Sequence, residues 1–229
     1  MLQYIGDFMK VNIAIDGPSG VGKSTVAKEL AKILNYTFIN SGSIYRAIAK
    51  NVIDRGIDTR DSANVITTLE DGMIKLLDND KIELYGQEVS LKLRADYISQ
   101  VTPNVAKIPQ VRNFVVNQIQ KITNHCKGYI IDGRDTTFKI MPHAEVKIFL
   151  WASPEERARR RLAQNKELGY NVNFNEVLLE IKKRDEQDMN REIDPLHKTE
   201  DSIFIDCSNL SLEELIAEIL TIVNSKKGN

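Results

Sequence analysis

Short apolar runs alternate along the chain with longer segments in which apolar residues recur every three or four positions. The short runs predict five β-strands, at Val11–Asp16, Thr37–Asn40, Gly128–Asp132, Val146–Trp151 and Ser202–Asp206. The intervening segments have the period of amphipathic helices. This alternation is typical of an α/β fold in which a parallel sheet is covered by helices on both faces.

Three of the predicted helices begin with a recognisable capping sequence. Ser153 is followed by a proline and two glutamates, which is a capping box with proline at the first helical position. The segments Asn173–Glu176 and Ser211–Glu214 follow the same logic with different caps. These signals predict where the last three helices begin.

One region breaks the alternation of strand and helix. Met73–Leu77 and Lys81–Tyr85 flank the polar turn Asp78–Asp80 and predict a small antiparallel hairpin. A hairpin inside a parallel fold is an insertion, and one of about thirty to forty residues is long enough to carry function. The chain has no internal repeat, low-complexity tract or linker, so the sequence predicts a single domain.

The bulk composition excludes little and favours an ordinary soluble protein. The 229 residues carry a formal net charge of −1, which gives no electrostatic argument for nucleic acid or a membrane surface. The two cysteines and three histidines lack metal-ligand spacing, and the longest apolar runs are too short to span a bilayer. Met1–Lys10 lacks the features of a secretory signal. We therefore expect a cytoplasmic monomer with no nucleic-acid or membrane partner.

The strongest chemical signal follows the first predicted strand. The sequence GPSGVGKS, at residues 17–24, is a glycine-rich loop that matches the phosphate-binding pattern GxxxxGK[ST] between a strand and a helix. In such a loop, backbone N–H groups and the positive end of the following helix surround an anion. Lys23 can reach the β- and γ-phosphates, and the Ser24 hydroxyl can ligate Mg²⁺. The alternative is a glycine-rich turn with an exposed lysine.

This loop predicts that the protein binds a nucleoside triphosphate, taken here to be ATP with Mg²⁺. The residues predicted to hold it are Gly17, Pro18, Ser19, Gly20, Val21, Gly22, Lys23, Ser24 and Thr25. Asp132 ends a predicted strand, where ligands bind in such sheets, and is the candidate for orienting Mg²⁺ through water. A simple turn-capping role is the alternative for Asp132.

The arginines indicate the second substrate. If a phosphoryl group passes from ATP to a nucleoside monophosphate, on the order of six negative charges must come together at neutral pH. Several guanidinium groups, each forking onto two phosphate oxygens, could offset that repulsion. Because a phosphate oxygen is already anionic, no general base is needed.

Two arginine-rich segments fit this requirement, and each has a plainer explanation. Arg184, Asp188 and Arg191 have the spacing i, i+4 and i+7, which predicts one shared helix face; the alternative is a solvated ladder of ion pairs. Arg157 and residues 159–161, all arginines, predict a mobile lid that closes over ATP and excludes water; the alternative is an exposed basic helix face.

Six segments in order resemble the bacterial-type cytidylate kinases. They are IDGPSGVGKST, NSGSIYRA, ISQVTPNVAKIPQVR, IDGRD, SPEERARRR and IKKRDEQDMNR, and the similarity runs from about Val11 to about Val223. The resemblance implies a P-loop kinase fold with a five-stranded parallel core, a monophosphate-binding insertion that contains the hairpin, and a short helical lid. It implies one kinase domain over residues 1–229, with a core at 11–60, 100–153 and 192–225, the insertion at about 61–99, and the lid and substrate helices at about 154–191. The implied reaction converts ATP and CMP or dCMP into ADP and CDP or dCDP.

The resemblance also assigns site residues. By its pattern, the acceptor phosphate region is contacted by Ser41, Arg46, Arg134 and Arg191, the pentose by Arg184 and Asp188, and cytosine by Ser99, Arg112 and Asp135. The catalytic set is Lys23, Arg134, Arg184 and Arg191, and the lid residues over ATP are Arg157, Arg160 and Arg161. An ionised Asp can accept from the cytosine N4 amino group while Arg and Ser donate, which predicts CMP and dCMP over UMP.

The chain departs from the family pattern at two places. Asn40 stands where the family usually has Asp, and Thr137-Phe138 stands where the family continues with Gly-Thr. The first change removes a charge, and the second removes a glycine beside the expected cytosine pocket.

Other functions stay open from the sequence alone. The acceptor could be UMP, AMP or a metabolite such as shikimate, or the chain could be a nucleotide-dependent switch without transfer activity. Nucleic-acid binding through Arg157–Arg161 is disfavoured by the net charge near zero.

Overall fold

The computed structural model describes residues 9–77, 80–167 and 169–227. Its centre is a five-stranded sheet of order β2-β6-β1-β7-β8 in which every neighbouring pair is parallel. The strands are β1 (Ile13–Asp16), β2 (Thr37–Asn40), β6 (Tyr129–Gly133), β7 (Val146–Trp151) and β8 (Ile203–Asp206). The α/β fold and all five predicted strands are confirmed, with their ends shifted by at most two residues.

Two hydrophobic cores cover opposite faces of this sheet. One core joins Ile13 and Ile15 to α1 (Lys23–Leu34) and α8 (Leu212–Lys227). The other joins Ala14 and Ile131 to α2 (Ser41–Asp54) and α5 (Pro109–Thr123). Successive strand residues point to opposite faces of the sheet. Since each face is covered by a core, both faces are apolar and the strands have no polar side.

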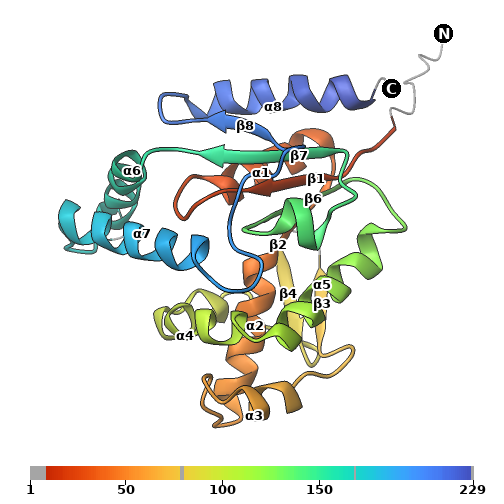
Figure 1. The fold of residues 1–229 in the computed structure, drawn as a ribbon, viewed down its shortest axis with the longest axis vertical. Helices are drawn as coiled ribbons and strands as arrows, with labels where there is room; N and C mark the ends of the chain where they lie inside the picture. The colour runs from red at the N-terminus through yellow and green to blue at the C-terminus, as the bar shows by residue number, and fades with distance from the viewer. Residues whose placement is uncertain (1–8, 78–79, 168, 228–229) are drawn as a thin grey trace.

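The predicted insertion forms a second, smaller layer. It contains α3 (Ser62–Thr67) and an antiparallel sheet of β3 (Ile74–Leu77), β4 (Lys81–Leu84) and β5 (Gln87–Glu88). The predicted hairpin is confirmed; Asp78 and Asn79 of its predicted turn lie outside the described residues. A short 3₁₀ helix, η1 (Lys92–Arg94), leads into α4 (Asp96–Ala106), which packs beside α2 (Figure 1).

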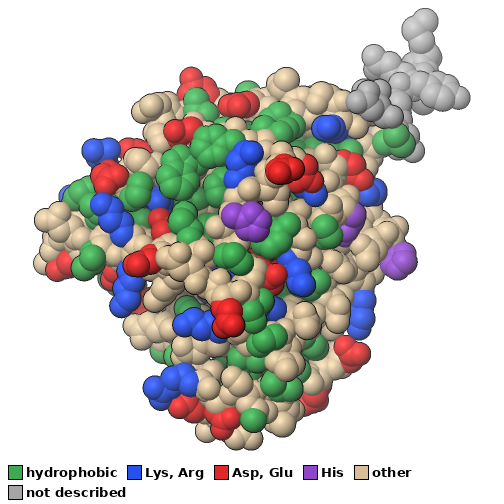
Figure 2. Space-filling model, viewed as in Figure 1, with side chains coloured by type: hydrophobic (Ala, Val, Ile, Leu, Met, Phe, Trp, Pro, Cys, Tyr) green, Lys and Arg blue, Asp and Glu red, His purple; other side chains and the backbone are tan. Residues whose placement is uncertain are grey.

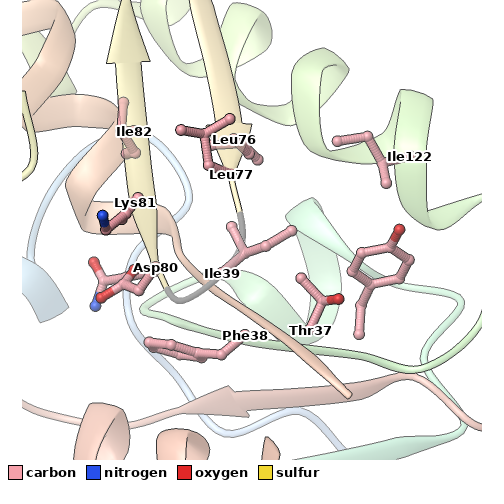
Figure 3. A pocket seen from close by; sticks show the side chains of 11 residues that line it. Thr37, Phe38, Ile39, Leu76, Leu77, Asp80, Lys81, Ile82 and Ile122 are labelled. Carbon is pink, nitrogen blue, oxygen red and sulfur yellow. The ribbon is translucent and has the colours of Figure 1, made fainter. Parts of the chain in front are cut away.

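The tip of this insertion is attached to the core of the protein. Asp80 forms an ion pair of 3.0 Å with Lys28 of α1, which follows the glycine-rich loop. Between the hairpin and β2 lies a cavity of about 200 Å³, lined by apolar side chains from both layers and by Asp80 and Lys81 (Figure 3). The cavity lies where the insertion meets the core, with the hairpin on one side and β2 on the other.

Two helices, α6 (Pro154–Glu167) and α7 (Phe174–Met189), form a pair at one side of the sheet (Figure 1). They share a small core of Ala158, Val177 and Ile181. Asn173 forms the predicted reciprocal capping box with Glu176. Ser153 Oγ accepts from Glu156 N at 3.2 Å, but the Ser153 N–H donates to Ser208 Oγ at 3.1 Å, so the predicted capping box there is only half formed. No helix among the described residues is long and apolar enough to cross a membrane.

Candidate functional site

The glycine-rich loop joins the end of β1 to the start of α1, at the carboxyl edge of the sheet. Gly17 has φ 151°, and a Cβ at this position would lie 2.2 Å from the carbonyl oxygen of Leu150, so only glycine fits. Gly22, the residue before α1, has φ 101°, which also favours glycine. The backbone is therefore shaped for an anion before any ligand binds.

Lys23 folds back over this loop. Its Nζ donates to the carbonyl oxygens of Gly17 at 2.6 Å and Pro18 at 2.8 Å. Burial, followed by the nearby charge of Arg134, holds the pKa of Lys23 well below its usual range, and Asp132 opposes this shift. A bound phosphate would offer the buried ammonium a charged acceptor, which favours a phosphate ligand at this position.

Ser24 and Asp132 form the centre of the candidate metal site. Ser24 Oγ donates to Asp132 Oδ2 at 2.5 Å, while Asp132 Oδ1 is buried and has no hydrogen-bond partner among the described residues. Burial raises the pKa of Asp132, and the charge of Lys23 opposes that rise. A hydroxyl and an unsatisfied carboxylate oxygen are hard donors that suit Mg²⁺.

The donor set also suits the way Mg²⁺ binds in nucleotide sites. No group of three or more His, Cys, Asp or Glu side chains is arranged to hold a metal within residues 9–77, 80–167 and 169–227. Mg²⁺ in such sites takes one or two protein oxygens and completes its shell with phosphates and water. The residues present therefore fit this ion.

Asn40 completes the surroundings of Ser24. Its Oδ1 accepts from Ser43 N at 2.9 Å and caps α2, and its Nδ2 donates to Ser24 Oγ at 3.1 Å. The hydroxyl hydrogen of Ser24 then points at Asp132. Asn40 thus links the acceptor-side helix to the candidate metal site without adding a negative charge.

Arg112 and Asp135, the pair assigned to cytosine, are both buried. Arg112 is fully buried, and its NH2 group is hydrogen-bonded to Asp135 Oδ2. Its Nε donates to Asp194 Oδ2 at 2.8 Å. Burial raises the pKa of Asp135, and the charges of Arg112 and Arg191 oppose that rise. The Arg112 guanidinium favours the ionised form of this carboxylate, which can accept a hydrogen bond.

Arg134 and Arg191 are paired with acidic or carbonyl oxygens. Arg134 Nε donates to Asp188 Oδ2 at 2.7 Å. Arg191 Nε donates to the carbonyl oxygen of Asp194 at 2.7 Å, and its NH2 lies 3.5 Å from Asp135 Oδ1. The cations assigned to the acceptor phosphate are therefore close to carboxylates that a phosphate could displace.

The expectation of one shared helix face for positions 184, 188 and 191 is wrong in one respect. Helix α7 ends at Met189, so Arg191 lies in the turn that follows. The backbone N–H of Leu196 donates to the carbonyl of Asp188 at 2.9 Å, and the chain folds back over the end of the helix. This turn brings Arg191 to Asp135, which a continued helix would not do.

Arg184 lies at the centre of the basic side chains. It is exposed to solvent, yet crowding by protein atoms and then the charge of Arg134 lower its pKa. Arg46 of α2 and Arg161 of α6 contribute to the same shift. Three other guanidinium groups are therefore close enough to repel that of Arg184, which favours an anionic ligand beside it.

The two serines assigned to the acceptor lie on neighbouring helices. Ser41 is buried, and its Oγ donates to the carbonyl oxygen of Asp132 at 2.8 Å, which brings the start of α2 to the candidate metal site. Ser99 is half-buried on α4, which packs against α2. The side chain of Ser99 is not joined to Arg112 or Asp135 by any hydrogen bond between described residues.

The arginines of α6 differ from the expected mobile cluster. Arg157 is fully buried: its Nε donates to Ala152 O at 2.9 Å, NH1 to Ser19 O at 2.8 Å and NH2 to Asp185 Oδ2 at 2.6 Å. This is a correction, because a guanidinium with three buried acceptors is not free to move over ATP. Arg160 donates to Cys207 O at 2.7 Å, at the end of β8. Arg159 and Arg161 are exposed, and Arg161 is near enough to Arg184 for its charge to act on that side chain.

Sequence reasoning missed three acidic residues that organise the site. Asp16 accepts from Thr136 N at 2.9 Å and Thr137 N at 2.8 Å, Asp185 accepts from Ser19 N at 3.2 Å, and Asp194 binds Arg112. Asp16 and Asp185 lie within two of the recognised segments and Asp194 lies shortly after the last of them, but only the fold shows what each carboxylate contacts. The motif sequence alone could not separate them from solvent-exposed acids.

The fold and the loop define a P-loop kinase: a parallel sheet with the phosphate loop after β1 and a cluster of arginines opposite. Solved structures with low sequence identity share this fold. A gluconokinase from Sinorhizobium meliloti 1021 is 16% identical, covers 96% of this chain and 95% of its own, and has a TM-score of 0.50. An uncharacterized protein from Eubacterium ventriosum is also 16% identical over 95% of this chain and 99% of its own, with a TM-score of 0.57.

Relatives in sequence define the family. The model of the cytidylate kinase family matches residues 13–225. A cytidylate kinase of Mycoplasmopsis synoviae is 61% identical and covers 94% of this chain and 99% of its own length. One from Mycoplasmopsis agalactiae is 49% identical over 95% of this chain and 98% of its own. The chain belongs to the cytidylate kinase family.

Proposed function

We propose that the protein transfers the γ-phosphoryl group of ATP to CMP or dCMP and releases ADP with CDP or dCDP. Membership of the cytidylate kinase family over residues 13–225 carries this proposal. The site observation that supports it is the grouping of Arg46, Arg134, Arg161 and Arg184 opposite a phosphate loop whose lysine is buried. Two polyanions need such a group of cations between them.

The donor end of the site binds the triphosphate. The N–H groups of the loop and the start of α1 surround the phosphates, and Lys23 turns from the loop carbonyls to a phosphate oxygen. Ser24 and, through water, Asp132 hold Mg²⁺, which when bound screens the phosphate charges. We assign Arg160 and Arg161 of α6 to the ATP side of the site, whereas Arg157 supports the loop by donating to the Ser19 carbonyl.

The acceptor end orients the monophosphate. Arg46, Arg134 and Arg191 bind its phosphate beside Ser41, and Arg184 and Asp188 bind the pentose. The attacking phosphate oxygen already carries charge, so the residues position it and stabilise the transferring group without taking a proton. Lys23, Arg134, Arg184 and Arg191 are the proposed catalytic residues: Lys23, Arg134 and Arg191 contact the reacting phosphates, and Arg184 adds positive charge beside them.

Base selectivity rests on Asp135 with Arg112 and Ser99. An ionised Asp135 accepts from the N4 amino group of cytosine, whereas uracil would present an oxygen to the same carboxylate. A buried mismatch of two acceptors discriminates strongly. The buried salt bridge to Arg112 supports this role because it keeps Asp135 ionised.

We further propose that the protein acts as a cytoplasmic monomer without nucleic acid. The two cysteines are free, which suits a reducing compartment. On the face in Figure 2, basic and acidic side chains are interspersed and form no broad area of one sign. Sedimentation velocity with and without added RNA tests the oligomeric state and the lack of RNA binding together.

A coupled assay of ADP release with CMP, dCMP, UMP, AMP and shikimate tests the function. CMP and dCMP should be turned over, with CMP preferred to UMP in kcat/KM by about 10²-fold or more. The Lys23→Ala variant should lose about 10²- to 10³-fold in kcat. Equal turnover of UMP and CMP would remove the role given to Asp135, and no turnover of any monophosphate would contradict the proposed function.

A further inference from the structure

At the tip of the phosphate loop, both backbone groups of Ser19 are hydrogen-bonded to side chains. The backbone carbonyl of Ser19 accepts from Arg157 NH1 at 2.8 Å, and its backbone N–H donates to Asp185 Oδ1 at 3.2 Å. The carbonyl is therefore fixed by α6 and the N–H by α7.

Arg157 and Asp185 also bind each other. Arg157 NH2 donates to Asp185 Oδ2 at 2.6 Å, and the Arg157 side chain is completely buried. Its Nε is bound to the carbonyl of Ala152, and its guanidinium lies 5.8 Å from the ring centroid of Trp151. A buried ion pair is costly to desolvate, so it is weak evidence for stability alone and invites a role in positioning.

Apolar contact reinforces the same junction. A Cβ added at Gly20 would lie 3.8 Å from Arg157 Cβ and 3.9 Å from Ile181 Cδ1, so the loop rests on the core shared by α6 and α7. In Figure 1 the loop after β1 extends toward these two helices. The loop and the helix pair are therefore one packed unit.

Helix α7 extends this unit to the acceptor side. Arg184 is the neighbour of Asp185 in sequence, and Asp188, one turn further, binds Arg134. The acceptor side of α7 therefore has a contact of its own, separate from the contact of Asp185 with the phosphate loop.

We propose that Arg157 and Asp185 are positioning residues that hold the Ser19 peptide of the phosphate loop in its anion-binding conformation. The pair contacts no substrate and acts through Ser19. This inference rests on the proposed function for the identity of the nucleotide, but ATP binding without turnover tests it independently.

The test uses a double variant, Arg157→Met with Asp185→Leu, which removes both charges and leaves neither partner unpaired. Its matched control is Glu155→Gln with Lys182→Met, which removes another ion pair between the same two helices, at 3.1 Å and exposed to solvent. Isothermal calorimetry gives the affinity for MgATP and for CMP separately, and thermal unfolding gives Tm. Hydrogen exchange of the loop amides reports the order of the Ser19 peptide without any ligand.

The Arg157/Asp185 double variant should bind ATP about tenfold more weakly, because binding must then order a loop peptide that was held before. CMP affinity should change by less than about twofold, and exchange of the loop amides should become faster. The control pair should leave ATP affinity and loop exchange unchanged. An unchanged ATP affinity in the double variant, or equal losses for ATP and CMP, would overturn the inference.

Arg157→Lys covers the case in which the double variant does not fold. Lysine keeps the charge beside Asp185 but lacks the planar fork that reaches three acceptors, so the Ser19 carbonyl is released. Its ATP affinity should fall between those of the parent and the double variant, with the fold retained. Parental ATP affinity and loop exchange in this variant would contradict the proposal.

Discussion

Asn40 shows how one residue connects two parts of the site. Its side-chain Oδ1 accepts from Ser43 N and so caps α2, and its side-chain Nδ2 donates to the hydroxyl of Ser24. The family pattern usually has Asp here, which would accept from Ser24 instead of donating to it. Asn40 therefore keeps the cap and removes one negative charge from the candidate Mg²⁺ site.

Replacing Asn40 by Asp should tighten Mg²⁺ binding. The new carboxylate would lie near Ser24 and Asp132, where a divalent cation is attracted, and it can still cap α2. We expect the Mg²⁺ concentration for half-maximal ATP binding to fall by about three- to tenfold. A calorimetric titration of ATP at several Mg²⁺ concentrations measures this, and Asn40→Ser, which caps without charge, is the control. An unchanged Mg²⁺ requirement in Asn40→Asp would show that position 40 does not influence the metal.

At the element scale, the π-helix η2 (Thr136–Ile140) positions Asp135, the residue that directly precedes it. Its first two backbone N–H groups and the Thr137 hydroxyl all donate to the buried carboxylate of Asp16, at distances of 2.7–2.9 Å. Thr137 occupies the position at which the family pattern has glycine, and its hydroxyl donates the third of these hydrogen bonds. The departure from the pattern thus adds an anchor to the segment that follows Asp135.

Thr137→Val should test this anchor. The substitution keeps the shape and removes one buried hydrogen bond to a charged acceptor, which costs about 1.5–3 kcal/mol of unfolding free energy. Urea denaturation with an unchanged m-value measures the loss. If Thr137→Val were as stable as the parent, the hydroxyl would not be an anchor of η2.

Elements with a clear apolar pattern could be predicted from the sequence, and those held by polar contacts could not. The strands of the parallel sheet are buried on both faces, so their apolar runs mark them directly. Strand β5 consists of two exposed residues, Gln87 and Glu88, and has no such signal. Helix α7 ends two residues before Arg191 because the following chain folds back and the Leu196 N–H donates to the carbonyl of Asp188, a contact that helical spacing does not reveal.

The site residues follow the same division. The phosphate loop could be predicted because its backbone geometry demands glycines at fixed positions. The buried position of Arg157 could not, because its neighbours Arg159 and Arg161 are exposed and all belong to one basic run. Periodicity cannot tell which arginine of such a run meets a carboxylate from another helix.

At the scale of the whole molecule, stability should depend on pH through His143, which lies before β7. Its Nε2 is buried and has no partner among the described residues, and burial lowers its pKa. The unfolded chain, with a histidine pKa of about 6.5, then takes up a proton at a higher pH than the folded chain does. Stability from this group is present above about pH 6.5 and is lost as the pH falls from there to the folded-state pKa.

His143→Gln should therefore lose less stability than the parent between about pH 7.5 and pH 5.5. Urea denaturation at several pH values measures both proteins, with His125→Gln, which changes an exposed histidine, as the control. Identical pH dependence for the parent and His143→Gln would contradict the role given to this side chain.

At the scale of the whole molecule, we propose that arginine side chains surround the place where the two phosphate chains meet. Arg134 is bound to Asp188 and Arg191 to the Asp194 carbonyl, so in the proposed roles substrate binding exchanges these oxygens for phosphate oxygens. The exchange keeps each guanidinium hydrogen-bonded throughout, which lowers the cost of binding a polyanion.

A crystal structure with CMP and a non-hydrolysable ATP analogue tests this account most directly. We expect the guanidinium groups of Arg46, Arg134 and Arg191 within hydrogen-bonding distance of the CMP phosphate, and Lys23 moved from the loop carbonyls to the triphosphate. Guanidinium groups that stay on Asp188 and Asp194, or turn away from a bound monophosphate, would contradict it.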